Sequence, residues 1–62
     1  MESDIFAALL RRINDRKQHI EVGLATGGAK SFEDYCRVVG EYTALNDTEA
    51  DIKELEKRYI EL

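Results

Sequence analysis

His19 and Cys36 are the two residues whose side chains could form a base and nucleophile pair. They stand on either side of a glycine-containing segment, so a chain that folds back there could bring them together. Nucleophilic catalysis also needs a group that orients the histidine and a pocket for the substrate. The sequence offers neither, since two helices enclose no pocket. We therefore expect Cys36 to be a buried core thiol beside His19 and predict no catalytic residue.

The segment Gly27–Ser31 resembles a phosphate-binding loop in part, because Lys30 and Ser31 directly precede an expected helix. It lacks the first glycine at the required spacing, and Ala29 stands where the glycine before the lysine belongs. We interpret the segment as a connector, with an anion bound at the following helix N-terminus as the alternative. Histidine and cysteine are not clustered as a structural zinc site requires. We expect no cofactor, no metal ion and no small-molecule substrate.

Cations gather in the first third of the chain, at Arg11, Arg12, Arg16 and Lys17. Three interpretations of this cluster are open: a contact for nucleic acid, a solvated face, or a binding surface for an acidic partner. The chain has 13 acidic and 9 basic residues and a net charge of −4. Non-specific nucleic-acid binding depends on a basic surface that neutralises phosphates. The charge therefore favours the solvated face or the acidic partner over nucleic acid.

Two amphipathic helices must position these residues. The first, about residues 3–25, begins with Ser3 as its N-cap. Its apolar stripe has the alternating spacing of four and three residues that is typical of a heptad, with Lys17 in one position of the stripe. The apolar members are Phe6, Leu10, Ile13, Ile20 and Leu24.

The second helix, about residues 32–61, begins at a capping box formed by Ser31 and Asp34. The poor helix formers of residues 46–48 interrupt its apolar pattern, and we expect a continuous helix, with a kink there as the alternative. Residues 26–30 contain two glycines and form the turn. The sequence thus predicts one all-α domain over residues 1–62, an antiparallel two-helix hairpin with a longer second helix. Gly23 and Gly40 are expected at points of close helix approach.

Folding the helices onto each other about residue 28 places Leu24 opposite Phe32 and Phe6 opposite Ala50. The last ten or so residues then lie beyond the first helix, at about 1.5 Å per residue. An apolar overhang of this kind usually marks an interface. Because a chain of 62 residues buries little surface, we expect an oligomer or a bound partner. The predicted interface residues are Ile5, Leu9, Ile52, Leu55, Tyr59 and Leu62.

Membrane insertion is not expected from the hydropathy pattern. No apolar run approaches the length of about 18 residues that a spanning helix needs, and the N-terminus lacks a signal-peptide core. The single cysteine is compatible with a reducing compartment. We therefore expect a soluble, intracellular chain.

The segment Gly23–Gly40, with the sequence GLATGGAKSFEDYCRVVG, resembles a pattern found in small helical proteins of tailed bacteriophages. In these proteins a helix ends in a GGAK or GRAK turn, and a DFxxYxxxxG segment and a long charged helix follow. The resemblance covers about residues 20–58, and the chain departs from it at residues 46–48. The matching positions here are Phe32, Tyr35, Gly40 and Leu45.

The resemblance implies a non-enzymatic structural or assembly protein of the virion, present in the host cytoplasm before assembly. Its partners would be copies of itself, capsid proteins, or portal and neck proteins. The alternative is a small acidic phage inhibitor of a host nucleic-acid-binding enzyme, in which the carboxylates of residues 47–62 imitate phosphates. Lys53, Lys57 and Arg58 interrupt that acidic run and count against the alternative.

Overall fold

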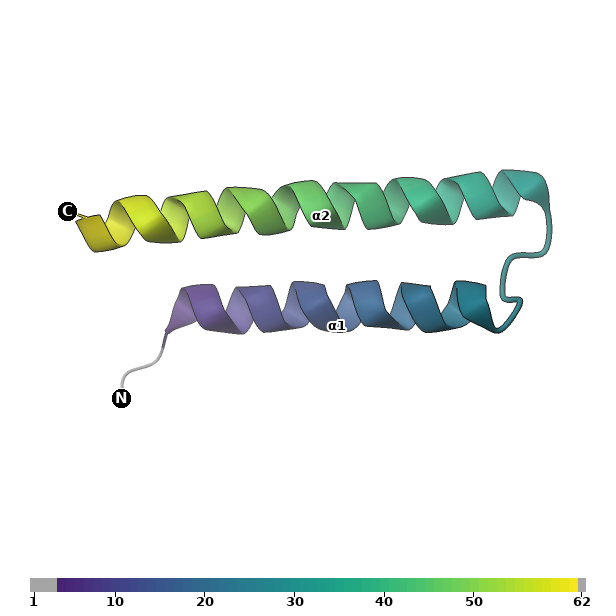
Figure 1. The fold of residues 1–62 in the computed structure, drawn as a ribbon, viewed down its shortest axis with the longest axis horizontal. Coiled ribbons are helices and arrows are strands. Elements are labelled where there is room, and N and C mark those ends of the chain that lie inside the picture. The colour runs from purple at the N-terminus through teal and green to yellow at the C-terminus, as the bar shows by residue number, and fades with distance from the viewer. Residues whose placement is uncertain (1–3, 62) are drawn as a thin grey trace.

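The computed structural model describes residues 4–61, which form two antiparallel helices joined by a short connection (Figure 1). Helix α1 spans Ile5–Ala25 and helix α2 spans Phe32–Glu61. The two helices pack side by side in one layer with overall dimensions of 47 × 20 × 11 Å. The all-α hairpin with a longer second helix is therefore confirmed.

Helix α1 begins one residue later than predicted, with Asp4 as the N-cap. The Asp4 carboxylate accepts hydrogen bonds from the backbone N–H groups of Phe6 at 3.0 Å and Ala7 at 3.2 Å. A carboxylate at this position also faces the positive end of the helix dipole. Ser3, the predicted cap, lies outside the described residues.

A glycine turn ends α1. The Gly28 N–H donates to the carbonyl of Gly23 at 2.6 Å, and the Gly27 N–H donates to that of Leu24 at 3.2 Å. This pair of bonds is a Schellman motif, in which the residue after the C-cap adopts a left-handed conformation. Gly27 has a φ of 79°, which costs little without a Cβ. A Cβ added at Gly28 would lie 2.6 Å from the Gly23 carbonyl oxygen.

Gly23 and Gly40 do not mark close helix approaches, so that expectation is wrong. A Cβ built at either position meets no heavy atom within 4 Å outside its own helix backbone. The close contact of Gly23 is made by its backbone carbonyl with the turn. Gly40 lies on the exposed surface of α2.

Alanine at Gly28 and alanine at Gly40 should have opposite effects on stability. Gly28→Ala should lower the free energy of unfolding by about 1 kcal/mol or more, because the new Cβ collides with the turn. Gly40→Ala should raise it by up to about 1 kcal/mol, because alanine is the better helix former and the space is open. Urea unfolding followed by far-UV circular dichroism at one protein concentration measures both. Equal stability of the two variants would contradict the turn geometry.

The predicted capping box at the start of α2 is confirmed. The Ser31 hydroxyl accepts a hydrogen bond from the Asp34 N–H at 3.0 Å. The Asp34 carboxylate accepts one from the Lys30 N–H at 3.1 Å, one residue earlier than in the usual capping box. These bonds fix the direction in which the chain enters α2.

Helix α2 continues through residues 46–48, as predicted. The Thr48 hydroxyl donates to the carbonyl of Ala44 at 2.9 Å, and the Thr43 hydroxyl donates to that of Val39 at 3.0 Å. Threonine in a helix commonly satisfies its hydroxyl in this way. The unfavourable propensity of this segment is therefore outweighed without a break in the helix.

The helices meet along a seam of residues that alternate at spacings of four and three. Of residues 4–60, only Ile13 is buried, with 8% of its surface exposed, and the other seam residues are half-buried. In α1 the seam consists of Phe6, Leu10, Ile13, Lys17, Ile20 and Leu24. In α2 it consists of Val38, Tyr42, Leu45, Glu49, Ile52 and Glu56.

The predicted register of the two helices is wrong. The rings of Phe6 and Tyr59 lie 5.6 Å apart between centroids, so Phe6 does not pack against Ala50. The connection crosses the ends of both helices, and the first turn of α2 projects past the end of α1 (Figure 1). This path shifts the pairing toward the C-terminal end of α2. The C-terminal overhang is consequently shorter than predicted, and Ile52 and Tyr59 have partners within the chain.

Candidate functional site

An ion pair crosses the seam at its centre. The Lys17 Nζ atom lies 2.9 Å from Glu49 Oε1, and only 16% and 22% of the two side chains are exposed. The same ammonium lies 5.4 Å from the centroid of the Tyr42 ring. Glu49 was not identified from the sequence as the partner of Lys17, because that choice requires the register of the two helices. Its position between Leu45 and Ile52, at the same spacing as the apolar residues, was the available signal.

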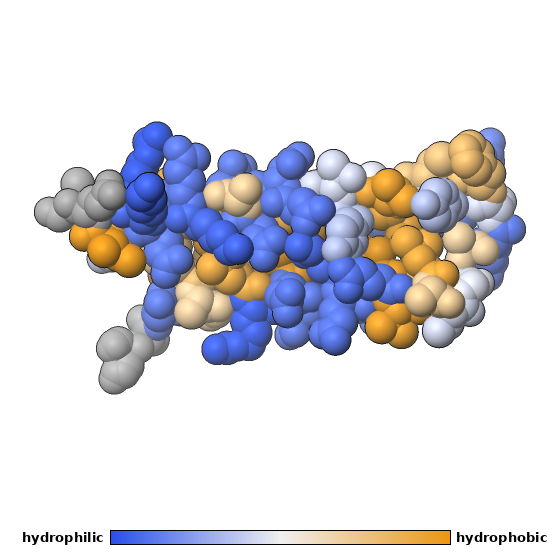
Figure 2. Space-filling view, viewed as in Figure 1, coloured by the Kyte–Doolittle hydropathy of each residue, from blue (hydrophilic) through white to orange (hydrophobic). Residues whose placement is uncertain are grey.

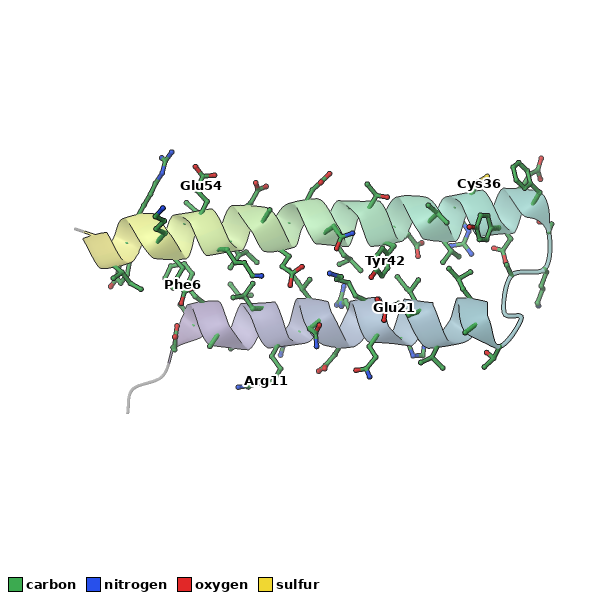
Figure 3. All side chains as sticks on the ribbon, viewed as in Figure 1. Phe6, Arg11, Glu21, Cys36, Tyr42 and Glu54 are labelled. Atoms are coloured by element: carbon green, nitrogen blue, oxygen red, sulfur yellow. The ribbon has the colours of Figure 1, made fainter. Side chains whose placement is uncertain are left out.

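A second polar contact lies beside this pair. The Tyr42 hydroxyl donates a hydrogen bond to the Glu21 carboxylate, and these two side chains face each other between the helices (Figure 3). That bond, followed by burial, raises the pKa of Tyr42 above its ordinary value. The hydrogen bond with Glu49 raises the pKa of Lys17, and the same bond lowers the pKa of Glu49. The seam is thus held in one register by polar as well as apolar contacts.

The stability of the hairpin should fall in acid. The hydrogen bond from Lys17 lowers the pKa of Glu49, and the hydrogen bond from Arg37 is the main cause of the lowered pKa of Asp34. A carboxyl whose pKa is lowered in the folded state stabilises the fold at pH values above its ordinary pKa, which is 4.5 for Glu49 and 3.8 for Asp34. That stabilisation is lost as the pH falls through the folded-state pKa. The midpoint temperature of thermal unfolding should therefore decrease once the pH falls below about 4.5.

Glu49→Gln isolates the seam contribution to this acid limb. The variant should lose stability at neutral pH and show a smaller further loss in acid, because residue 49 no longer titrates. Glu54→Gln is the matched control, since Glu54 lies on the exposed surface of α2, 3.1 Å from Arg58. Thermal scans by circular dichroism from neutral pH to about pH 3 make the comparison. Identical pH profiles for the two variants would refute the role of Glu49.

An open groove, here called the flank groove, runs along one side of the hairpin between the helices. Its volume is about 630 Å³. Its floor is apolar and its rim is charged, which is the pattern of a protein-binding surface. The principal floor residues are Ile20, Ala44 and Leu45, and the principal rim residues are Arg16, His19 and Glu41.

A smaller hollow of about 450 Å³, here called the end hollow, lies at the open end of the hairpin and is lined by Phe6, Leu55, Arg58 and Tyr59. Helical spacing places Leu55 on the side of α2 that carries Glu41 and Thr48, since these positions are seven residues apart. The flank groove and the end hollow therefore belong to one flank. Figure 2 shows one face of the molecule, on which hydrophilic atoms cover much of both helices and apolar atoms emerge in patches between them.

The predicted interface residues fall into three groups. Ile5, Leu9, Leu55 and Tyr59 are exposed apolar residues at the open end of the hairpin. Ile52 is half-buried in the seam and so is largely occupied within the chain. Leu62 lies outside the described residues. The interface itself stays a prediction.

His19 and Cys36 are not brought together. Cys36 is exposed and lies on the side of α2 away from α1 (Figure 3). The expected buried thiol is wrong, because the seam of α2 follows Val38 and Tyr42 and Cys36 lies on another face of the helix. His19 lies on the rim of the flank groove.

Within residues 4–61, no group of three or more His, Cys, Asp or Glu side chains is close enough to hold a metal ion. Neither helix of this segment combines the length and apolar character that crossing a membrane requires. Comparisons of the chain with protein-family models, with curated proteins and with solved structures gave no match.

Proposed function

We propose that this chain is a non-enzymatic assembly protein that docks onto other proteins through its helical flanks. The observation that carries the proposal is the small interior of the hairpin, in which Ile13 is the one buried residue of residues 4–60. Large apolar side chains such as Ile5 and Leu55 remain exposed instead. A short chain with this distribution gains most of its apolar burial on binding.

The setting that we propose is the particle of a tailed bacteriophage, on capsid, portal or neck proteins. Support for it comes from the resemblance of the segment Gly23–Gly40 to small phage proteins. Two structural details fit that pattern, since the glycines close the turn after α1 and Ser31 caps the long second helix. The chain would reside in the virion and, before assembly, in the host cytoplasm.

Mass spectrometry of purified particles tests this proposal. Particles of the phage whose genome encodes the chain should contain it at a fixed ratio to one structural protein, and the ratio should survive a high-salt wash. The matched control is the infected-cell lysate from which the particles were taken. Presence in the lysate together with absence from both immature and mature particles would refute the virion assignment.

Inhibition of a host nucleic-acid-binding enzyme is the weaker candidate. A phosphate mimic needs carboxylates that are free to meet a basic groove. Here Glu49 is paired with Lys17 and lies 3.8 Å from Lys53, and Glu54 is paired with Arg58. Recovery of a host nuclease or polymerase subunit by the tagged chain at low salt would reverse this preference.

A further inference from the structure

We infer that the flank groove and the end hollow together bind a second copy of this chain, giving a four-helix bundle in which α1 of each copy packs antiparallel on α2 of the other. The inference deepens the proposed function, because it names one occupant of the docking flank. It does not depend on the phage setting.

The apolar residues of the flank are arranged to meet their counterparts in a second copy. When the two-fold axis runs parallel to the helices, α1 of one copy faces its partner's α2 in the same register as within the hairpin. That register brings the start of α1 to the end of α2, as the contact of Phe6 with Tyr59 shows. Leu9 of each copy then faces the end hollow of the other, which Leu55 lines.

The charges of the flank are complementary in the same arrangement. The flank edge of α1 carries Arg12 and Arg16, with Asp15 between them. Helical spacing places Asp51, seven residues after the groove residue Ala44, on the flank edge of α2, and Asp47 one turn earlier on the outer side of that helix. The register set by Lys17 and Glu49 puts these two stretches opposite each other. A second copy therefore brings Arg12 and Arg16 toward Asp51 at both of its helix contacts.

The other way of stacking the flanks about a two-fold axis is disfavoured by these charges. An axis perpendicular to the helices would place α1 on α1 and bring Arg12 and Arg16 against their own copies. It would also bring the carboxylates of the two α2 helices together. Like charges held in contact oppose association, so the α1-on-α2 arrangement is the one that the sequence supports.

A charge-swap experiment tests the inference. The first variant is Arg12→Glu with Arg16→Glu, and the second is Asp47→Lys with Asp51→Lys. Each variant replaces a pair of like charges four residues apart by a pair of like charges of the opposite sign. The repulsion within the helix therefore stays about the same, and the helix itself is little affected. Each variant alone should dimerise about tenfold more weakly or worse than the unchanged chain, because both contacts become repulsive.

Mixing the two variants should restore dimers of mixed mass in native mass spectrometry, since both contacts become attractive again. Recovery on mixing separates an effect between copies from an effect within one hairpin, which mixing cannot repair. The control is Arg11→Glu with Lys57→Glu, which changes the net charge by the same amount as the first variant. Arg11 points away from α2 (Figure 3), so this variant should still dimerise.

Three outcomes would overturn the inference: an unchanged chain that is monomeric at all concentrations, charge variants that dimerise as tightly as it does, or no recovery on mixing. A monomeric chain that is still found in particles would leave the proposed function standing and remove the second copy. If dimers recover on mixing but the chain is absent from particles, the second copy stands and the virion role is removed.

Discussion

Replacing Ile13 with alanine should remove a large share of the stability of the hairpin. Ile13 lies at the middle of the seam and has 8% of its surface exposed. Truncating a buried isoleucine to alanine costs about 2–5 kcal/mol in ordinary cores. A core of this size rarely supplies more than about 3–5 kcal/mol in total. Urea unfolding at one protein concentration should therefore show a midpoint close to zero denaturant for Ile13→Ala.

Val22→Ala is the matched control for that change. Val22 is a β-branched residue of the same helix, and it is exposed. Its replacement should alter stability by no more than about 0.5 kcal/mol, because little apolar contact is lost. Equal losses for Ile13→Ala and Val22→Ala would mean that the seam between the two helices is not the core in solution.

Leu55→Asp should dissociate the proposed dimer and lower the midpoint of thermal unfolding together. Leu55 has 57% of its surface exposed in the hairpin, although it lines the apolar end hollow. Covering a leucine side chain is worth about 1.5–3 kcal/mol, and a two-fold dimer contains the position twice. Sedimentation velocity and thermal scans at matched concentrations should therefore change in the same variant.

Ile60→Asp provides the comparison for Leu55→Asp. Ile60 is more exposed, at 72%, and lies about 140° around α2 from Leu55. The Ile60→Asp variant should keep the mass and the melting point of the unchanged chain. If Leu55→Asp behaves like Ile60→Asp in dilute solution, the flank is no interface between copies, and a different protein must cover it.

Much of the fold could be predicted because local chemistry determines it. Ser31 and Asp34 identify the start of α2, and the spacing from Phe6 to Leu24 identifies the face of α1 that packs. The start of α1 was misplaced by one residue because Ser3 and Asp4 are both good N-caps. Such errors leave the architecture unchanged.

The register could not be predicted, because it depends on the path of the connection in space. Glycines at residues 27 and 28 indicate that the chain turns, but they do not state how far it travels before α2 begins. The exaggerated C-terminal overhang follows from this error. Of the candidate site, the exposure of Ile5 could be predicted from its place beside the stripe of α1. Leu55 is exposed as expected, but because it lies on the flank and not because it extends beyond α1. The flank groove could not, since it needs both helices in position.

The shortest dimension of the hairpin is 11 Å, about the diameter of a single helix. In a slab this thin, every seam side chain except Ile13 keeps part of its surface in water. A protein that covers the flank therefore completes the core as it binds, and folding and binding become one equilibrium. With such a partner, copies made in excess would open more often and meet proteases first. Because the hairpin is thin, unbound copies would be degraded, and the amount of protein that persists would follow the number of binding sites.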